Sequence, residues 1–222
     1  MKTLTIIFDM PLRHSELSQF RGAIVAAIPS SNILFHNHNG TTLRYAYPLI
    51  QYKRIEGKAA IVCIGEGVEA ISEFLTRADF NIMLGTRKVA LRIERIDAEE
   101  VDIGEALPPI TYCLNNWLAL NENNYRKFQA IDSIAERIQM LERILAGNIL
   151  SMLKGLNIRI DFRLQPIITD YTANRTAIYK GVRLTSLNIT FKANILLPEY
   201  IGLGKHSSMG TGVLTKKKPN NQ

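Results

Sequence analysis

The sequence predicts an α+β fold made of two domains. The chain has 222 residues, which suits one large or two small domains. Short β-rich segments alternate with amphipathic helical segments in both halves. An acidic stretch that ends in two prolines, residues 98–109, interrupts this pattern. We therefore place the domains at residues 1–105 and 106–222.

The predicted elements of the first half follow the order strand, helix, strand, strand, helix, strand. Apolar residues recur at every second position in the strands and at steps of three and four in the helices. The predicted strands are residues 2–8, 43–50, 58–64 and 87–96, and the predicted helices are 15–28, capped by Ser15, and 67–78. This order is that of the ferredoxin-like fold, in which both helices cover one face of an antiparallel sheet.

The second half loosely repeats the pattern of strand, helix and several strands. A β-rich segment, residues 110–120, precedes Asn121, which is expected to cap a short helix. Ser133 begins a capping-box pattern, and apolar residues then recur with helical spacing as far as Gly155, where the helix should end. Residues 157–198 are mostly β-rich. A duplicated sheet-and-helix domain is one interpretation, and a single larger α+β domain is the other.

Positive charge is concentrated in the second half. Residues 1–105 carry 12 of the 27 Lys and Arg and 13 of the 20 Asp and Glu, whereas residues 106–222 carry 15 and 7. Such a basic half favours an anionic partner, of which nucleic acid is the commonest. No apolar run is long enough to cross a membrane, and both cysteines, Cys63 and Cys113, lie in apolar runs. We therefore expect a cytoplasmic protein without a membrane partner.

The most distinctive motif is glycine-rich and lies near the end of the chain. Closely spaced glycines let backbone amides approach a phosphate, and polar neighbours would add hydrogen-bond donors. The spacing fits neither the dinucleotide-binding fingerprint nor a Walker loop. A tight turn between strands explains it equally well. The residues are Gly202, Gly204, Lys205, His206, Ser207, Gly210 and Gly212.

A second motif places two of the 4 histidines in one polar loop. His36 and His38 lie in the segment FHNHNG, and Tyr45 follows. A metal site would need further ligands, and none is nearby, so we expect neither metal nor cofactor. An imidazole can instead take the proton of a ribose 2′-hydroxyl or give one to the leaving 5′-oxygen, which yields a 2′,3′-cyclic phosphate. Two solvated loop histidines are the alternative.

Cations and aromatic residues interleave in the β-rich part of the second half. Cations bind a nucleic-acid backbone and aromatic rings stack on bases, so this set suits single-stranded or hairpin RNA. A solvated sheet face with core aromatics is the alternative. The cations are Lys154, Arg159, Arg163, Arg175, Lys180, Arg183 and Lys192.

Three segments resemble a known family. The string LRYAYPLIQYK, preceded by HNHNG and followed by GKAAIVCIGEG, is similar to the amino-terminal domain of CRISPR-associated endoribonucleases of the subtype-b branch. The helix ending LERILAGNILSMLKGLNI resembles the carboxy-terminal domain of that branch. The segment LNITFKANILLPEYIGLGKHSSMGTGVL resembles the glycine-rich signature of the superfamily. One departure is Thr211, where the signature often has an apolar residue.

The resemblance implies two tandem ferredoxin-like (RRM-like) domains and cleavage of CRISPR repeat RNA without a metal. It places general acid-base catalysis on His38, with His36 assisting and Tyr45 as a supporting donor. The glycine-rich loop would hold the RNA backbone, and His206 is a second catalytic candidate.

Two other interpretations stay open. A guide-RNA-binding subunit of a CRISPR effector complex would hold RNA without cutting it, and its partners would include effector proteins. A regulatory protein with paired ferredoxin-like domains would bind small ligands, and its RNA binding would be weak and indifferent to salt. The sequence also leaves open whether the chain forms a homodimer.

Overall fold

The computed structural model divides the chain into two compact units. The first comprises Met1–Val101 together with Ser208–Gly210, and the second comprises Asp102–Ser207 and Thr211–Gln222. The structure describes residues 1–28, 33–36, 38–39, 42–43, 47–77, 80–174, 177–179 and 182–217.

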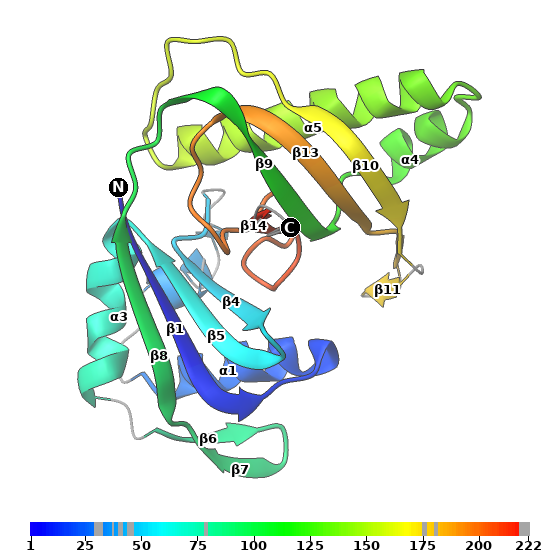
Figure 1. Ribbon diagram of the computed structural model, residues 1–222. Coiled ribbons are helices and arrows are strands. Elements are labelled where there is room, and N and C mark those ends of the chain that lie inside the picture. Colours follow the sequence, from blue (N-terminus) through cyan, green and yellow to red (C-terminus); the bar gives the residue numbers. More distant parts are fainter. Residues whose placement is uncertain are drawn as a thin grey trace, which may run out of the picture. The chain divides into compact units, whose positions relative to one another are not determined.

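The first unit is built on a four-stranded antiparallel sheet with the strand order β4-β5-β1-β8. Two helices cover one face of this sheet (Figure 1), as the order of elements predicts for a ferredoxin-like domain. The elements of this layer are β1 (Lys2–Pro11), η1 (His14–Glu16), α1 (Leu17–Ala26), β4 (Ile50–Ile55), β5 (Lys58–Ile64), α3 (Glu66–Arg77) and β8 (Ile93–Glu100).

Three smaller features complete the first unit. A one-turn helix and a short hairpin lie in the connection between α1 and β4, and a second hairpin follows α3. They are α2 (Ile33–His36), β2 (His38–Asn39) paired with β3 (Thr42–Leu43), and β6 (Asn81–Leu84) paired with β7 (Arg87–Ala90).

Apolar residues of the sheet and of both helices form one core in the first unit. Phe8 of β1, Phe20 of α1 and Phe74 of α3 are fully buried. The ring of Phe8 meets the rings of Phe20 and Phe74 edge-on, at centroid distances of 6.1 and 6.5 Å. Phe35 of α2 belongs to the same core, so the connection that carries the histidine motif is anchored at this residue.

The second unit is also built on a four-stranded antiparallel sheet, with the order β10-β13-β9-β14. The long helix α5 packs along one face of it (Figure 1). The elements are β9 (Glu105–Trp117), α4 (Glu122–Gln129), α5 (Ile134–Gly155), β10 (Ile167–Ala173), β11 (Ala177–Tyr179), β12 (Val182–Leu184), β13 (Leu187–Ile195) and β14 (Val213–Lys216).

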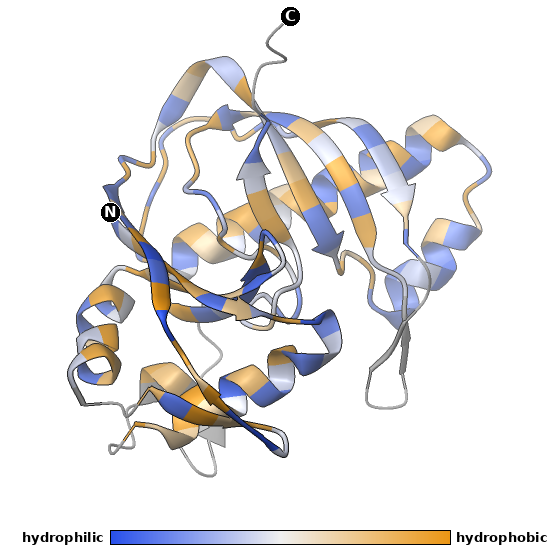
Figure 2. Cartoon of the chain, turned by 60° about the horizontal axis from the view of Figure 1, so that its bottom comes forward, coloured by the Kyte–Doolittle hydropathy of each residue, from blue (hydrophilic) through white to orange (hydrophobic). Residues whose placement is uncertain are grey.

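Both helices of the second unit begin at the predicted caps. The Asn121 side chain accepts a hydrogen bond from the Asn124 amide at 2.7 Å, and Ser133 accepts one from the Glu136 amide at 3.4 Å. Figure 2 shows hydrophobic residues recurring along α5, and its residues Leu141, Leu145, Ile149, Met152 and Leu153 are buried. No described helix is both long and apolar enough to span a membrane.

The bounds of the strand predicted at 43–50 are wrong. The strand that pairs with β5 is Ile50–Ile55, which runs directly into the turn at Gly57. Pro48 has no amide hydrogen to donate to a ladder, and its carbonyl accepts instead from the side chain of Gln51 at 3.0 Å. Of the predicted strand, residues 44–46 lie outside the described residues and 47–49 form no strand.

The first-half strand predicted at 87–96 is two strands, β7 and β8, and β7 belongs to the unpredicted β6–β7 hairpin. Gly85, at φ +63°, supplies the left-handed turn of this hairpin. The expected cap at Ser15 is also wrong, because Arg13 stands at the cap position ahead of η1.

Residues 157–166 form no strand despite their alternating apolar pattern. The side chain of Asn194 accepts from the Gln165 amide at 2.8 Å and donates to the Arg163 carbonyl at 3.0 Å. These bonds satisfy one backbone amide and one backbone carbonyl of the segment without a neighbouring strand.

Candidate functional site

The histidine motif lies in the connection between α1 and β4. His36 is the last residue of α2, and His38 is the first residue of β2, where it pairs with Leu43. The preceding residue, Phe35, is 1% exposed, which fixes the backbone at this point. The side chains of both histidines and the whole of Tyr45 lie outside the described residues. Their catalytic assignment therefore stays a prediction.

The two ends of the glycine-rich segment pair with each other in the second unit. Gly202 makes a β-bridge with Val213, and the Leu203 amide donates to the Gly212 carbonyl at 2.8 Å. The Gly212 amide donates in turn to the Asn116 carbonyl at 3.1 Å. The loop is therefore fastened at its base to the end of β9 and the start of β14.

Two glycines of this loop are required by the backbone itself. Gly204 has φ +85°, and a Cβ there would lie 2.9 Å from the indole nitrogen of Trp117. Gly212 has φ +58°, and a Cβ there would lie 1.9 Å from the carbonyl oxygen of Leu203. Turn geometry thus accounts for this spacing, and contact of the loop with a phosphate stays a prediction.

The polar residues of the loop divide into exposed and buried ones. Lys205 and His206 are exposed, and His206 adopts the left-handed conformation at φ +55°. Thr211, the departure from the family signature, donates through its hydroxyl to the Lys205 carbonyl at 2.6 Å. Ser207 is only 7% exposed, so Lys205 and His206 are the predicted donors that face solvent.

The middle of the glycine-rich segment, Ser208–Gly210, belongs to the first unit. The Tyr52 amide of β4 donates to the Ser208 carbonyl at 2.9 Å, and Met209 forms a parallel bridge with Tyr52. At Gly210, which has φ +73°, a Cβ would lie 2.7 Å from a methyl carbon of Leu17. Because β4 is the edge strand of its sheet, these residues cover part of its open side.

The predicted cations are only partly described. Arg159 and Arg163 are exposed on the irregular segment after α5, rather than on a strand. Arg175 and Lys180 lie outside the described residues. Arg183 pairs with Ile178 in the β11–β12 hairpin, but its side chain is not described. Their contact with RNA stays a prediction.

An asparagine network holds the base of this hairpin. The Asn174 amide group donates to the Asn116 and Asn188 side-chain oxygens at 3.2 and 3.1 Å and to Ser186 Oγ at 3.0 Å. The Asn188 side-chain oxygen also accepts from the Asn116 backbone amide at 2.8 Å. Because the Asn116 carbonyl accepts from Gly212, one residue of β9 fastens both the hairpin and the glycine-rich loop.

Strand β4 carries a buried lysine that no sequence pattern indicated. Lys53 has 0% exposure, and burial lowers its pKa to about 7. Gln51, which faces the same side of the strand, is also fully buried. Among the described residues, no three His, Cys, Asp or Glu side chains come together as metal ligands would.

Each half of the chain matches a known protein family domain. Residues 1–102 match the Cas6b N-terminal domain, and residues 105–217 match the Cas6b C-terminal domain. The chain belongs to the Cas6b family. A curated relative, an uncharacterised protein of Methanocaldococcus jannaschii, is 31% identical over 118 residues, which are 53% of this chain and 78% of the relative.

Solved structures share the fold. A crystal structure of Cas6b has a TM-score of 0.82 at 23% identity, over 98% of this chain and 100% of the other. A Cas6b described as a CRISPR RNA processing endoribonuclease has a TM-score of 0.73 with the same identity and coverage. Csf5, described as a type IV Cas6 crRNA endonuclease, has a TM-score of 0.56 at 13% identity, over 98% of this chain and 100% of the other. The tandem ferredoxin-like architecture of Cas6b thus extends over the whole chain.

Proposed function

We propose that this chain is a cytoplasmic, metal-independent endoribonuclease that cuts CRISPR repeat RNA within precursor transcripts and so releases guide RNAs. The observation that carries the proposal is the pair of family matches, which span residues 1–102 and 105–217. The fold shared with a Cas6b described as a CRISPR RNA processing endoribonuclease supports it.

In the proposed mechanism an imidazole of the α1–β4 connection, for which we favour His38, takes the proton of a ribose 2′-hydroxyl. The 2′-oxygen attacks the adjacent phosphorus, and the bond from phosphorus to the 5′-oxygen breaks. His36 and Tyr45 are the candidates to protonate the leaving oxygen or to stabilise the phosphate. The products carry a 2′,3′-cyclic phosphate and a 5′-hydroxyl.

The RNA is proposed to bind through the second unit. Lys205 and His206 are exposed at the glycine-rich loop, and Arg159 and Arg163 are exposed after α5. Each cation that contacts a phosphate releases a counterion from the RNA, so the affinity should fall steeply with salt.

The test is cleavage of the host's own repeat RNA by the full chain in the presence of a chelator. We expect wild type to leave cyclic phosphate ends, detected by mass spectrometry. A repeat with a 2′-deoxyribose at the scissile position should bind equally well and stay intact, because it lacks the nucleophile. His38→Ala should slow cleavage by at least a hundredfold with nearly unchanged affinity.

Three outcomes would contradict this assignment. Cleavage of the deoxy-substituted repeat, or loss of all activity with chelator, would contradict the mechanism. Tight, salt-dependent RNA binding by wild type without any cleavage would favour the guide-RNA-binding subunit instead.

A further inference from the structure

A cluster of cations lies at one corner of the first unit. Residues 1–105 carry 13 acidic side chains against 12 Lys and Arg, so a local excess of positive charge is not expected there. The cluster joins three segments of the chain: Arg13 and His14 after β1, Arg54 near the end of β4, and Arg87 at the start of β7. All four residues are exposed.

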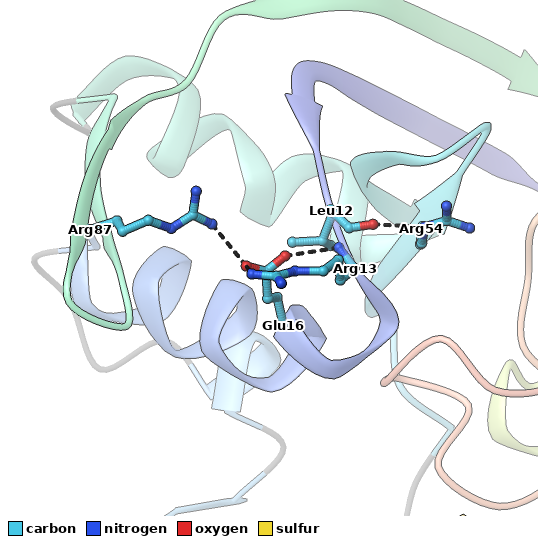
Figure 3. Close-up of polar contacts among 5 residues, drawn as sticks. All are labelled: Leu12, Arg13, Glu16, Arg54 and Arg87. Atoms are coloured by element: carbon cyan, nitrogen blue, oxygen red, sulfur yellow. Dashed lines mark hydrogen bonds and ion pairs between the residues drawn. The ribbon is translucent and has the colours of Figure 1, made fainter.

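A single carboxylate, that of Glu16, compensates part of this charge (Figure 3). It accepts from Arg13 Nη2 at 2.9 Å, from the Arg13 backbone amide at 2.9 Å and from Arg87 Nη2 at 2.8 Å. The hydrogen bonds from Arg13 hold the pKa of Glu16 at about 2, so it is ionised at neutral pH. Two guanidinium groups, those of Arg13 and Arg87, thus share one acid, and one positive charge remains on this trio.

Arg54 is held in place by the backbone rather than by an acid. Its Nε donates to the Leu12 carbonyl at 2.7 Å, and its guanidinium points away from Glu16 (Figure 3). In the described part of the chain no carboxylate pairs with Arg54. The nearby turn carries Glu56, but that carboxylate is engaged by Arg95 at 3.8 Å. The two terminal nitrogens of Arg54 therefore stay available as an ordered fork.

His14 lies close enough to Arg54 to feel its charge. Partial burial lowers the pKa of His14, and the Arg54 guanidinium lowers it further. A protonated His14 and the Arg54 guanidinium therefore repel each other. An anion placed between them would remove that repulsion, and a guanidinium fork matches the oxygens of a phosphate.

We propose that Arg54, with His14 beside it, forms a phosphate-binding site on the first unit, which takes one phosphodiester of the RNA strand. The proposal rests on the proposed function, because it assigns a second contact to the same substrate. RNA binding is then not confined to the basic second half. Because residues 1–105 have a net negative charge, the composition of the first half does not indicate this site.

The test is Arg54→Gln in the full chain, compared with Lys2→Gln as the matched control. Lys2 is also an exposed cation of the first unit, with a side chain 65% exposed, and β1 separates it from the cluster by roughly 30 Å of extended strand. Affinity for repeat RNA is measured between 50 and 300 mM salt, and cleavage is measured at saturating RNA.

We expect Arg54→Gln to weaken RNA binding about tenfold and to reduce the slope of log affinity against log salt by about 0.7, the value for one single-strand phosphate. Lys2→Gln should bind and cut repeat RNA as wild type does. Arg54→Lys keeps the charge and should restore most of the slope, which separates loss of a phosphate contact from misfolding.

The outcomes separate this proposal from the proposed function. If wild type neither binds nor cuts repeat RNA, the proposed function fails. If wild type does both and Arg54→Gln matches Lys2→Gln, only the phosphate site is refuted.

An NMR titration gives a second measurement, because bound RNA should raise the pKa of His14 in wild type. An unchanged value with bound RNA would refute the site, and an equal rise with inorganic phosphate at the same phosphate concentration would refute its assignment to RNA.

Discussion

Gly212→Ala is the substitution for which the structure predicts the largest loss at the glycine-rich loop. A left-handed backbone costs a residue with a Cβ about 1 kcal/mol. The new Cβ would also lie 1.9 Å from the Leu203 carbonyl oxygen, so the backbone at residue 212 must move away from Leu203. That movement breaks the bonds from Leu203 to Gly212 and from Gly212 to Asn116, each worth about 1 kcal/mol. The total is about 3 kcal/mol.

The measurement is urea unfolding of the full chain, with Gly147→Ala as the matched control. Gly147 lies inside α5, and a Cβ there meets nothing within 4 Å. The free energy of unfolding of Gly147→Ala should therefore be about 0.5–1 kcal/mol higher than that of wild type, because alanine has the better helix propensity. If Gly212→Ala costs less than about 1 kcal/mol, the conclusion that turn geometry requires this glycine is wrong.

Three further predictions concern single side chains. Arg13 lowers the pKa of Glu16 to about 2, so the ionised carboxylate stabilises wild type above pH 4.5, and this stabilisation is lost as pH falls towards 2. Glu16→Gln should lack this pH-dependent stabilisation, which is checked by measuring the free energy of unfolding between pH 2 and 7. Lys53→Met should stabilise the chain at pH 6 by about 5 kcal/mol at most, because burial lowers the pKa of Lys53 from 10.5 to about 7. Wild type should become more stable as pH rises from 7 to 10.5, and the variant should not. Asn148→Leu should cost about 2 kcal/mol in thermal unfolding, because the buried indole N–H of Trp117 loses its acceptor at 2.9 Å.

Local signals were sufficient for much of the fold. Asn121 and Ser133 both cap helices because a short polar side chain followed by a helical period has few other structures available. The resemblance singled out the glycine-rich segment as a motif. It could not show that Gly204 and Gly212 are needed for close packing, because the atoms they approach belong to Trp117 and Leu203.

Features that depend on distant residues were missed for a physical reason. Arg54 and His14 are forty positions apart in the sequence, and nothing in either local pattern indicates that the charge of one acts on the other. The burial of Lys53 is likewise a property of the packed sheet, since its segment alone reads as an ordinary strand. The histidines predicted to be catalytic show the converse case. The resemblance named His36 and His38, and the structure fixes only their backbone.

The assignment of Ser208–Gly210 to the first unit has a consequence for dissecting the chain. A fragment that stops at Val101 would lack the residues that bond to Tyr52, and the outer side of β4 would lose that cover. Such an uncovered edge invites pairing with another molecule. Expressing the halves separately should therefore give an aggregation-prone first fragment unless the missing tripeptide is supplied, for example on a short linker.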